Sequence, residues 1–194
     1  MTFFPPKWEN KTTFQEMTSD LFEVYTDGAC SNNGRGSAVA GIGVHWPHDT
    51  TRDIAQPVTG LKHTNNVAEL QAIEAALDGI RAHEAKDGSL AHFVIFSDST
   101  YAINCLTTWW ALWKARGTFP PHMQNKDLIV CIQEKLAAFG PRVSLRHVFG
   151  HADSEGNIRA DALARKGAKA KAEPEPKPKA SGSSSSRKRA RSTS

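Results

Sequence analysis

Two β-rich segments of this chain each end in a hydroxyl residue followed by an aspartate. Residues 21–26 (LFEVYT) alternate apolar and polar side chains before Asp27, and residues 93–97 (FVIFS) form an apolar run before Asp98. Alternation is typical of a strand with one buried face, and a continuous apolar run favours a strand buried on both faces. Because ligands usually lie at the carboxyl ends of sheet strands, these acids are expected to point into a cleft.

The remaining pattern predicts one mixed sheet covered by helices. Further strands are expected at three places, residues 39–46, 50–59 and 143–149. Apolar residues at helical spacing predict four helices, over residues 64–82, 99–115, 126–139 and 157–168. The order βββαβααβα puts three antiparallel strands before strands joined by helical crossovers. This is an α/β fold with a five-stranded mixed sheet flanked by helices.

Charge and composition divide the chain into three parts. Residues 169–194 hold eight basic and two acidic residues, a net charge of +6, which leaves −2 for residues 1–168 out of the formal +4. The Pro- and Ser-rich composition predicts that residues 169–194 are a disordered tail. Its cluster Arg187–Arg191 indicates a nuclear localisation signal, a nucleic-acid tether or a solvated charge run. Residues 21–168 are expected to form the folded domain, preceded by a leader of undetermined order at residues 1–20.

Several classes of protein are excluded or disfavoured. No apolar run approaches the roughly 18 residues of a membrane span, so no membrane partner is expected. The three cysteines are widely spaced and form no CxxC pair, which argues for a reducing compartment and against a zinc site. The chain has no GxSxG, P-loop or GxGxxG motif, which removes the serine hydrolase, NTPase and dinucleotide-binding interpretations.

Four carboxylates stand in distinctive local sequences. Asp27 and Asp98 follow strands, Glu69 lies in TNNVAEL on a predicted helix, and Asp161 lies in GHADSEGNIRADALA near the start of the last one. Taken singly, the acid before Ser99 is compatible with a helix cap and Asp161 with a helix N-terminal charge. Taken together, acids beside apolar elements indicate a doubly positive partner, since burying an unpaired carboxylate is costly. Hard oxygen ligands favour Mg²⁺ or Mn²⁺, and a pair of such ions suits phosphodiester hydrolysis.

In order and spacing, the motifs YTDGA, TNNVAEL, DSTYAI with its following tryptophans, and GHADSEGNIRADALA resemble type 1 ribonuclease H, in its eukaryotic form, over about residues 21–168. The resemblance implies a ribonuclease H-like fold and hydrolysis of the RNA strand of RNA/DNA hybrids, leaving a 5′-phosphate and a 3′-hydroxyl. It implies a monomer that uses two Mg²⁺ ions, with Mn²⁺ as the alternative, and it identifies no protein partner. The implied metal-binding acids are Asp27, Glu69, Asp98 and Asp161, and His151 would assist proton transfer or product release.

The resemblance also implies a nucleic-acid-binding set. Amides at Asn33, Asn65 and Asn66 would reach the minor groove, where the 2′-hydroxyl distinguishes RNA from DNA. Trp109 and Trp113 would form a channel for the DNA strand. The pocket for a DNA phosphate would consist of Lys62, Thr64 and Asn125. Two departures stand out: Lys62 replaces an arginine common in relatives, and Thr118 replaces an aromatic residue that commonly follows the tryptophans.

Two other hypotheses remain open at this stage. One is a catalytically silent hybrid-binding module, which missing acids would have favoured, although none is missing. The other is a different nuclease or strand-transfer enzyme on the same fold, such as a resolvase or an integrase-like domain. Substrate preference distinguishes this second class from a ribonuclease H, because such an enzyme would cleave duplex DNA about as well as an RNA/DNA hybrid. The basic tail favours the nucleus as the location, with the cytoplasm as the alternative.

Overall fold

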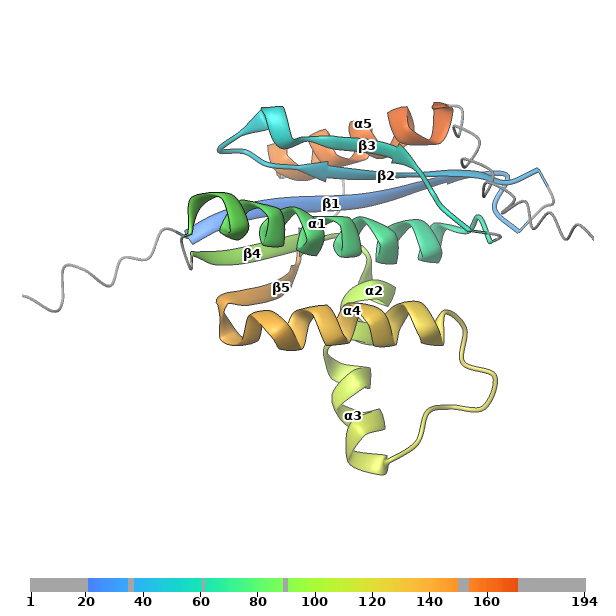
Figure 1. The fold of residues 1–194 in the computed structure, drawn as a ribbon. Helices are drawn as coiled ribbons and strands as arrows, with labels where there is room; N and C mark the ends of the chain where they lie inside the picture. The colour runs from blue at the N-terminus through green and yellow to red at the C-terminus, as the bar shows by residue number, and fades with distance from the viewer. Residues whose placement is uncertain (1–20, 35–36, 61, 89–90, 150–153, 171–194) are drawn as a thin grey trace, which may run out of the picture.

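A five-stranded mixed sheet forms the centre of the molecule (Figure 1). The computed structural model describes residues 21–34, 37–60, 62–88, 91–149 and 154–170 of the 194-residue chain. The strand order is β3-β2-β1-β4-β5, with β1–β2 and β2–β3 antiparallel and β1–β4 and β4–β5 parallel. The predicted mixed sheet is therefore confirmed, with strands β1 (Leu21–Ser31), β2 (Val39–His45), β3 (Ile54–Pro57), β4 (His92–Ser97) and β5 (Val143–His147).

Within the described residues, α5 covers one face of the sheet and α1 the other. Helix α5 packs against β1, β2 and β3, whereas α1 packs against β1, β2 and β4 and also contacts α4 (Figure 1). Helices α2 and α3 follow β4, and α3 projects away from the sheet. No helix within the described residues is long and apolar enough to cross a bilayer. The helices are α1 (Asn65–Asp87), α2 (Thr100–Leu106), α3 (Thr108–Arg116), α4 (Lys126–Phe139) and α5 (Glu155–Lys169).

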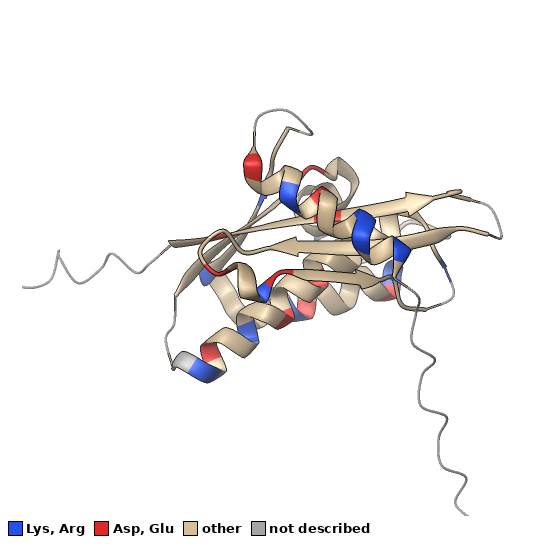
Figure 2. Cartoon of the chain, turned by 90° about the horizontal axis from the view of Figure 1, so that it is seen from above, with Lys and Arg blue, Asp and Glu red and all other residues tan. Residues whose placement is uncertain are grey.

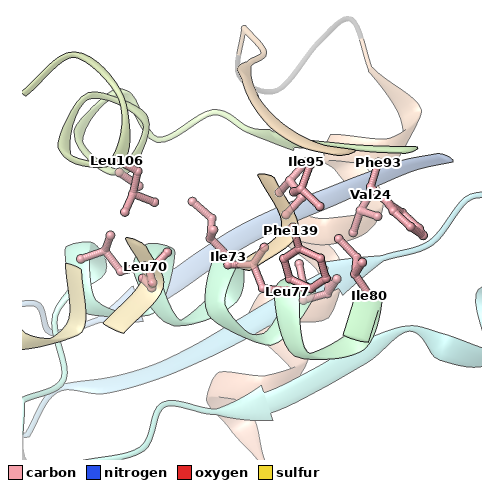
Figure 3. Close-up of a cluster of buried hydrophobic side chains, with 14 of the residues drawn as sticks. Val24, Leu70, Ile73, Leu77, Ile80, Phe93, Ile95, Leu106 and Phe139 are labelled. Atoms are coloured by element: carbon pink, nitrogen blue, oxygen red, sulfur yellow. The ribbon is translucent and has the colours of Figure 1, made fainter. Parts of the chain in front are cut away.

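The main core lies on the α1 side of the sheet. Long aliphatic and aromatic side chains from β1, α1, β4, α2 and α4 meet there, as the α1 side chains at helical spacing face those of the strands (Figure 3). Burying each such side chain stabilises the fold by roughly 1.5–3 kcal/mol before conformational entropy is counted. The residues labelled in Figure 3 are Val24, Leu70, Ile73, Leu77, Ile80, Phe93, Ile95, Leu106 and Phe139.

Several predicted element boundaries were wrong; α1, for example, was expected to end at residue 82 but continues to Asp87. Strand β1 does not end at residue 26 but continues to Ser31, because its antiparallel ladder with β2 extends to the pair Ser31–Val39. The strand expected over residues 50–59 is only the four residues of β3. Its first part is a 3₁₀ turn, Thr50–Arg52, which the Asp49 side chain begins by accepting a hydrogen bond from the Thr51 backbone.

The single helix expected over residues 99–115 is divided in two at Thr107. The backbone there has φ −124° and ψ −88°, outside the helical region. The Thr107 hydroxyl donates a hydrogen bond to the Ile103 carbonyl at 2.6 Å, a local bond that competes with the helical ladder. As a result α2 packs into the core, while α3 contributes no fully buried residue.

Candidate active site

Asp27 and Asp98 lie side by side where one of two paired strands stops. The parallel ladder between β1 and β4 ends at the pair Thr26–Ser97, and the next residues are the two aspartates. Strand β1 runs on through Asp27, which pairs with Gly43 of β2. The prediction that Asp27 follows the end of a strand was therefore wrong. Strand β4 ends instead, and β1 has no β4 partner from Asp27 onward.

Glu69 reaches this edge from the second turn of α1. The Gly28 backbone N–H donates to Glu69 Oε2 at 3.1 Å, and the Asn65 side-chain amide donates to Oε1 at 3.3 Å. Helix and strand approach closely enough for this because residue 28 has no side chain. A Cβ on Gly28 would lie 2.3 Å from the Glu69 nitrogen, far inside van der Waals contact.

A second glycine lets Asp161 approach from the opposite face of the sheet. A Cβ on Gly43 would lie 2.1 Å from the Ala160 carbonyl oxygen, so only glycine allows α5 to lie this close to β2. Asp161 is the seventh residue of α5, beyond its first turn, so the alternative of an ordinary helix N-terminal charge does not fit it. Asp161 Oδ1 lies 2.9 Å from the Arg165 Nε on the next turn, and the Asp161 charge is close enough to Asp27 to raise the pKa of that carboxyl.

The acids are mutually repulsive where they meet. Carboxylate oxygens of Asp27, Glu69 and Asp98 lie within 4.8 Å of one another. Burial, followed by the charges of Asp98 and Asp161, raises the pKa of Asp27 from 3.8 to about 7. Burial, followed by the charges of Asp27 and Asp98, raises the pKa of Glu69 from 4.5 to about 9. The group contains oxygen donors only, which fits a hard divalent cation such as Mg²⁺ or Mn²⁺, whose charge would offset the repulsion.

Asn157 is part of the site although the sequence assigned it no role. Its side-chain amide donates to Asp98 Oδ2 at 3.0 Å, which fixes one oxygen of that carboxylate. The residue is only 1% exposed, and its Oδ1 makes no hydrogen bond within the described part of the chain. Its place in the motif GHADSEGNIRAD could have marked it as a candidate site residue. Its contact with Asp98 could not be predicted, because that contact depends on how α5 packs on the sheet.

The structure places another histidine, His147, at this edge. Its Nε2 lies 3.2 Å from the Asp98 carbonyl oxygen and 3.3 Å from the Thr100 hydroxyl. The predicted catalytic histidine, His151, lies outside the described residues, as do the leader at residues 1–20 and the tail from residue 171 onward. The role of His151 therefore stays a prediction.

Three asparagines predicted to contact the minor groove lie at the mouth of the acidic cluster. Asn65 donates to Glu69 with its side chain, and its backbone N–H donates to Asn33 Oδ1 at 3.4 Å. Asn33 and Asn66 are exposed. The loop after β1 and the start of α1 therefore bring amide groups together beside the carboxylates.

The three residues predicted to hold a phosphate are only partly brought together. Lys62 and Asn125 line one hollow between the start of α1 and the start of α4, with His122 and Lys126. Thr64 is not among the residues that line this hollow; its hydroxyl caps α1 by accepting a hydrogen bond from the Val67 backbone at 3.2 Å and keeps its own proton to donate. Elsewhere lysines and arginines are spread over several helices and interspersed with acids (Figure 2), so the hollow is a local basic feature.

The two tryptophans predicted to form a channel lie on α3. The ring centroids of Trp109 and Trp113 are 6.3 Å apart, and Trp109 is the more exposed of the two. Phe119 lies 5.9 Å from Trp113 and supplies an aromatic ring next to Thr118, where the sequence suggested one was lost. Half-buried Trp110 and Trp113 also pack against the core, so the tryptophans both support α3 and present an aromatic surface.

Comparisons with known proteins agree with this geometry. A family model described as RNase H matches residues 19–169. Ribonuclease H of Schizosaccharomyces pombe is 42% identical over 153 residues, and human ribonuclease H1 is 36% identical over 163 residues. The alignments cover 77% and 82% of this chain but 54% of each relative, so the chain spans about half their length. Ribonuclease H of Hyphomonas neptunium is 34% identical over 76% of this chain and 92% of that protein.

Solved structures give the same family. The structure of RNase H1 from Halobacterium salinarum has a TM-score of 0.50 and 26% identity, covering 76% of this chain and 96% of that one. LC9-RNase H1, described as a type 1 RNase H with the type 2 active-site motif, has a TM-score of 0.54 and 27% identity. The alignment with LC9-RNase H1 covers 76% of this chain and 72% of that chain.

The raised pKa values predict that stability falls with pH when no divalent cation is present. Unfolded carboxyl groups lose their protons near pH 4, whereas folded Asp27 and Glu69 retain them to about pH 7 and 9. The folded state therefore binds more protons across this window, and the free energy of unfolding decreases as the pH rises through it. Glu69→Gln should flatten this slope, as measured by urea unfolding at pH 5 and pH 9. Exposed Glu134→Gln is the control, and equal slopes in both variants would contradict the prediction.

Proposed function

This chain belongs to the ribonuclease H family, and from that premise we propose that it is a metal-dependent endonuclease that hydrolyses the RNA strand of RNA/DNA hybrids. The observation that carries the proposal is the meeting of the Asp27, Glu69 and Asp98 carboxylates within 4.8 Å, with the charge of Asp161 acting on Asp27. The products would carry a 5′-phosphate and a 3′-hydroxyl. The protein would act as a monomer, and it would need no nucleophilic side chain.

Two divalent ions, Mg²⁺ or Mn²⁺, are the proposed cofactors, held by Asp27, Glu69, Asp98 and Asp161. When bound, such a pair can activate a water for attack and stabilise the leaving oxygen of the phosphodiester. The residues of this chain orient the carboxylates through hydrogen bonds. The Gly28 N–H and the Asn65 amide each fix one Glu69 oxygen, and the Asn157 amide fixes one oxygen of Asp98.

Strand discrimination would come from the groups around the acids. Amides at Asn33, Asn65 and Asn66 both donate and accept hydrogen bonds, as contact with a 2′-hydroxyl requires. The exposed faces of Trp109 and Trp113 would pack against deoxyribose of the DNA strand, where a 2′-hydroxyl would clash. Lys62 and Asn125 would hold a DNA phosphate in the hollow they line. We also propose His151 for proton transfer or product release, on the basis of its sequence context.

Cleavage of matched duplexes tests the proposal directly. The protein should cut only the RNA strand of an RNA/DNA hybrid, and neither RNA/RNA nor DNA/DNA, with activity lost in EDTA. Asp98→Asn should reduce cleavage below detection while hybrid binding persists, because the amide keeps the shape but loses the charge that holds the cation. Asp78→Asn, an exposed acid paired with Lys135, is the matched control and should cleave normally. Comparable cleavage of duplex DNA would favour a different nuclease on this fold, and full activity of Asp98→Asn would refute the assignment.

A salt titration tests the phosphate contact. Lys62→Ala should weaken hybrid binding and reduce the slope of log Kd against log salt concentration by about 1, because one fewer phosphate is neutralised. Binding is measured with Asp98→Asn in both proteins so that the hybrid stays intact. Lys86→Ala, exposed near the other end of α1, should leave the slope unchanged. An unchanged slope for Lys62→Ala would remove Lys62 from the interface.

The tail is proposed to direct the protein to the nucleus. The proposal is supported by the basic cluster Arg187–Arg191 at the end of a Pro- and Ser-rich segment. Deleting residues 181–194 should move a fluorescent fusion to the cytosol without changing turnover on short hybrids. A fusion that stays in place would instead assign the cluster to nucleic-acid tethering or to a solvated tail.

A further inference from the structure

Phe149 is the most exposed of the large hydrophobic side chains in the described part of the chain. It is 82% exposed, compared with 60% for Leu21, the next in rank. A single exposed hydrophobic residue is ordinary on a protein surface, so exposure by itself decides nothing. What distinguishes Phe149 is its position relative to the acids.

The end of β5 holds Phe149 beside Asp98. The parallel ladder between β4 and β5 reaches the pair Ser97–His147, and the Val148 N–H then donates to the Ser97 carbonyl at 3.1 Å. Phe149 is the next residue, so it follows β5 past the same sheet edge at which Asp98 follows β4. Asp98 and Phe149 therefore follow the ends of two adjacent strands at the same edge of the sheet.

His147 fixes the orientation of the ring. Its imidazole lies edge-to-face with Phe149, with centroids 5.6 Å apart and an interplanar angle of 87°. The imidazole Nε2 is in turn 3.2 Å from the Asp98 carbonyl oxygen. The Phe149 ring is thus connected to the backbone of a catalytic acid through one side chain. Because the imidazole meets it edge-to-face, a broad face of Phe149 is left for solvent.

We propose that Phe149 is a stacking platform for a nucleotide of the strand that is cut, next to the scissile phosphate. This inference rests on the proposed function. A phosphodiester held at the acids places its flanking nucleotides beside them, and Phe149 follows β5 where Asp98 follows the neighbouring strand β4. An aromatic face stacks on any base, and it offers no hydrogen bond with which to read the sequence.

Hybrids that lack one base test the platform. A series of substrates carries a single abasic ribonucleotide at each position around the main cut, and kcat/KM is measured for each. In the unsubstituted protein, removal of the base at one position should lower kcat/KM about 5-fold or more relative to the intact hybrid. This factor corresponds to the lower end of the free energy of base–aromatic stacking. Phe149→Ala should lower kcat/KM on the intact hybrid by a similar factor and lose its sensitivity at that position. Phe149→Trp should keep the sensitivity, and Phe149→Leu should behave like Phe149→Ala.

Two controls and two decisive outcomes complete the experiment. Leu21→Ala removes an exposed apolar side chain from the far end of β1 and should match the unsubstituted protein on every substrate. Thermal unfolding of Phe149→Ala should be unchanged, because an exposed ring contributes little to the core. If each missing base lowers kcat/KM of Phe149→Ala as much as it lowers that of the unsubstituted protein, Phe149 is not a stacking platform, even when the enzyme is active. If the unsubstituted protein does not cleave the intact hybrid, the proposed function itself fails.

Discussion

The close approach of two helices to the strand backbone is the constraint on which this site depends. Helix α1 meets β1 at Gly28, and α5 meets β2 at Gly43, the residue paired with Asp27. A Cβ at either glycine would meet backbone atoms, and backbone atoms of a packed helix cannot move aside as a side-chain end can. The two helices therefore bring Glu69 and Asp161 to the acids of the sheet from opposite faces. Gly28 and Gly43 thus determine how close α1 and α5 lie to the strands, and this spacing determines where the carboxylates meet.

The fold holds groups together that repel one another. Buried acids with raised pKa values oppose folding near neutral pH, so the burial of aliphatic and aromatic side chains along α1 has to exceed that cost. Hydrogen bonds from the Gly28 backbone, Asn65 and Asn157 set the directions of the carboxylates before any cation arrives. Such a locally unfavourable arrangement within a well-packed domain is typical of a functional site.

The sequence predicted the order of strands and the meeting of the acids, because both follow from periodicity and from motifs that carry their own local context. It failed where a single long-range or local bond decides the outcome. The length of β1 is set by its pairing with β2, and the break at Thr107 coincides with a hydroxyl bond to Ile103. The contact of Asn157 with Asp98 joins residues 59 positions apart and depends on the docking of α5. The cap that Thr64 forms by accepting a hydrogen bond from the Val67 backbone was likewise not predicted.

Helix α3 stands apart from the rest of the domain in one respect, since none of its residues is fully buried. The break at Thr107 before it and the left-handed Gly117 after it separate it from its neighbours in the chain. Substitutions on its outer face consequently change little of the core, and the acids are held entirely by other elements. Under the proposed contact of Trp109 and Trp113 with the DNA strand, substitutions on the exposed side of α3 would change substrate affinity and leave the acids in place. Affinity and catalysis are free to diversify at different rates within the same chain.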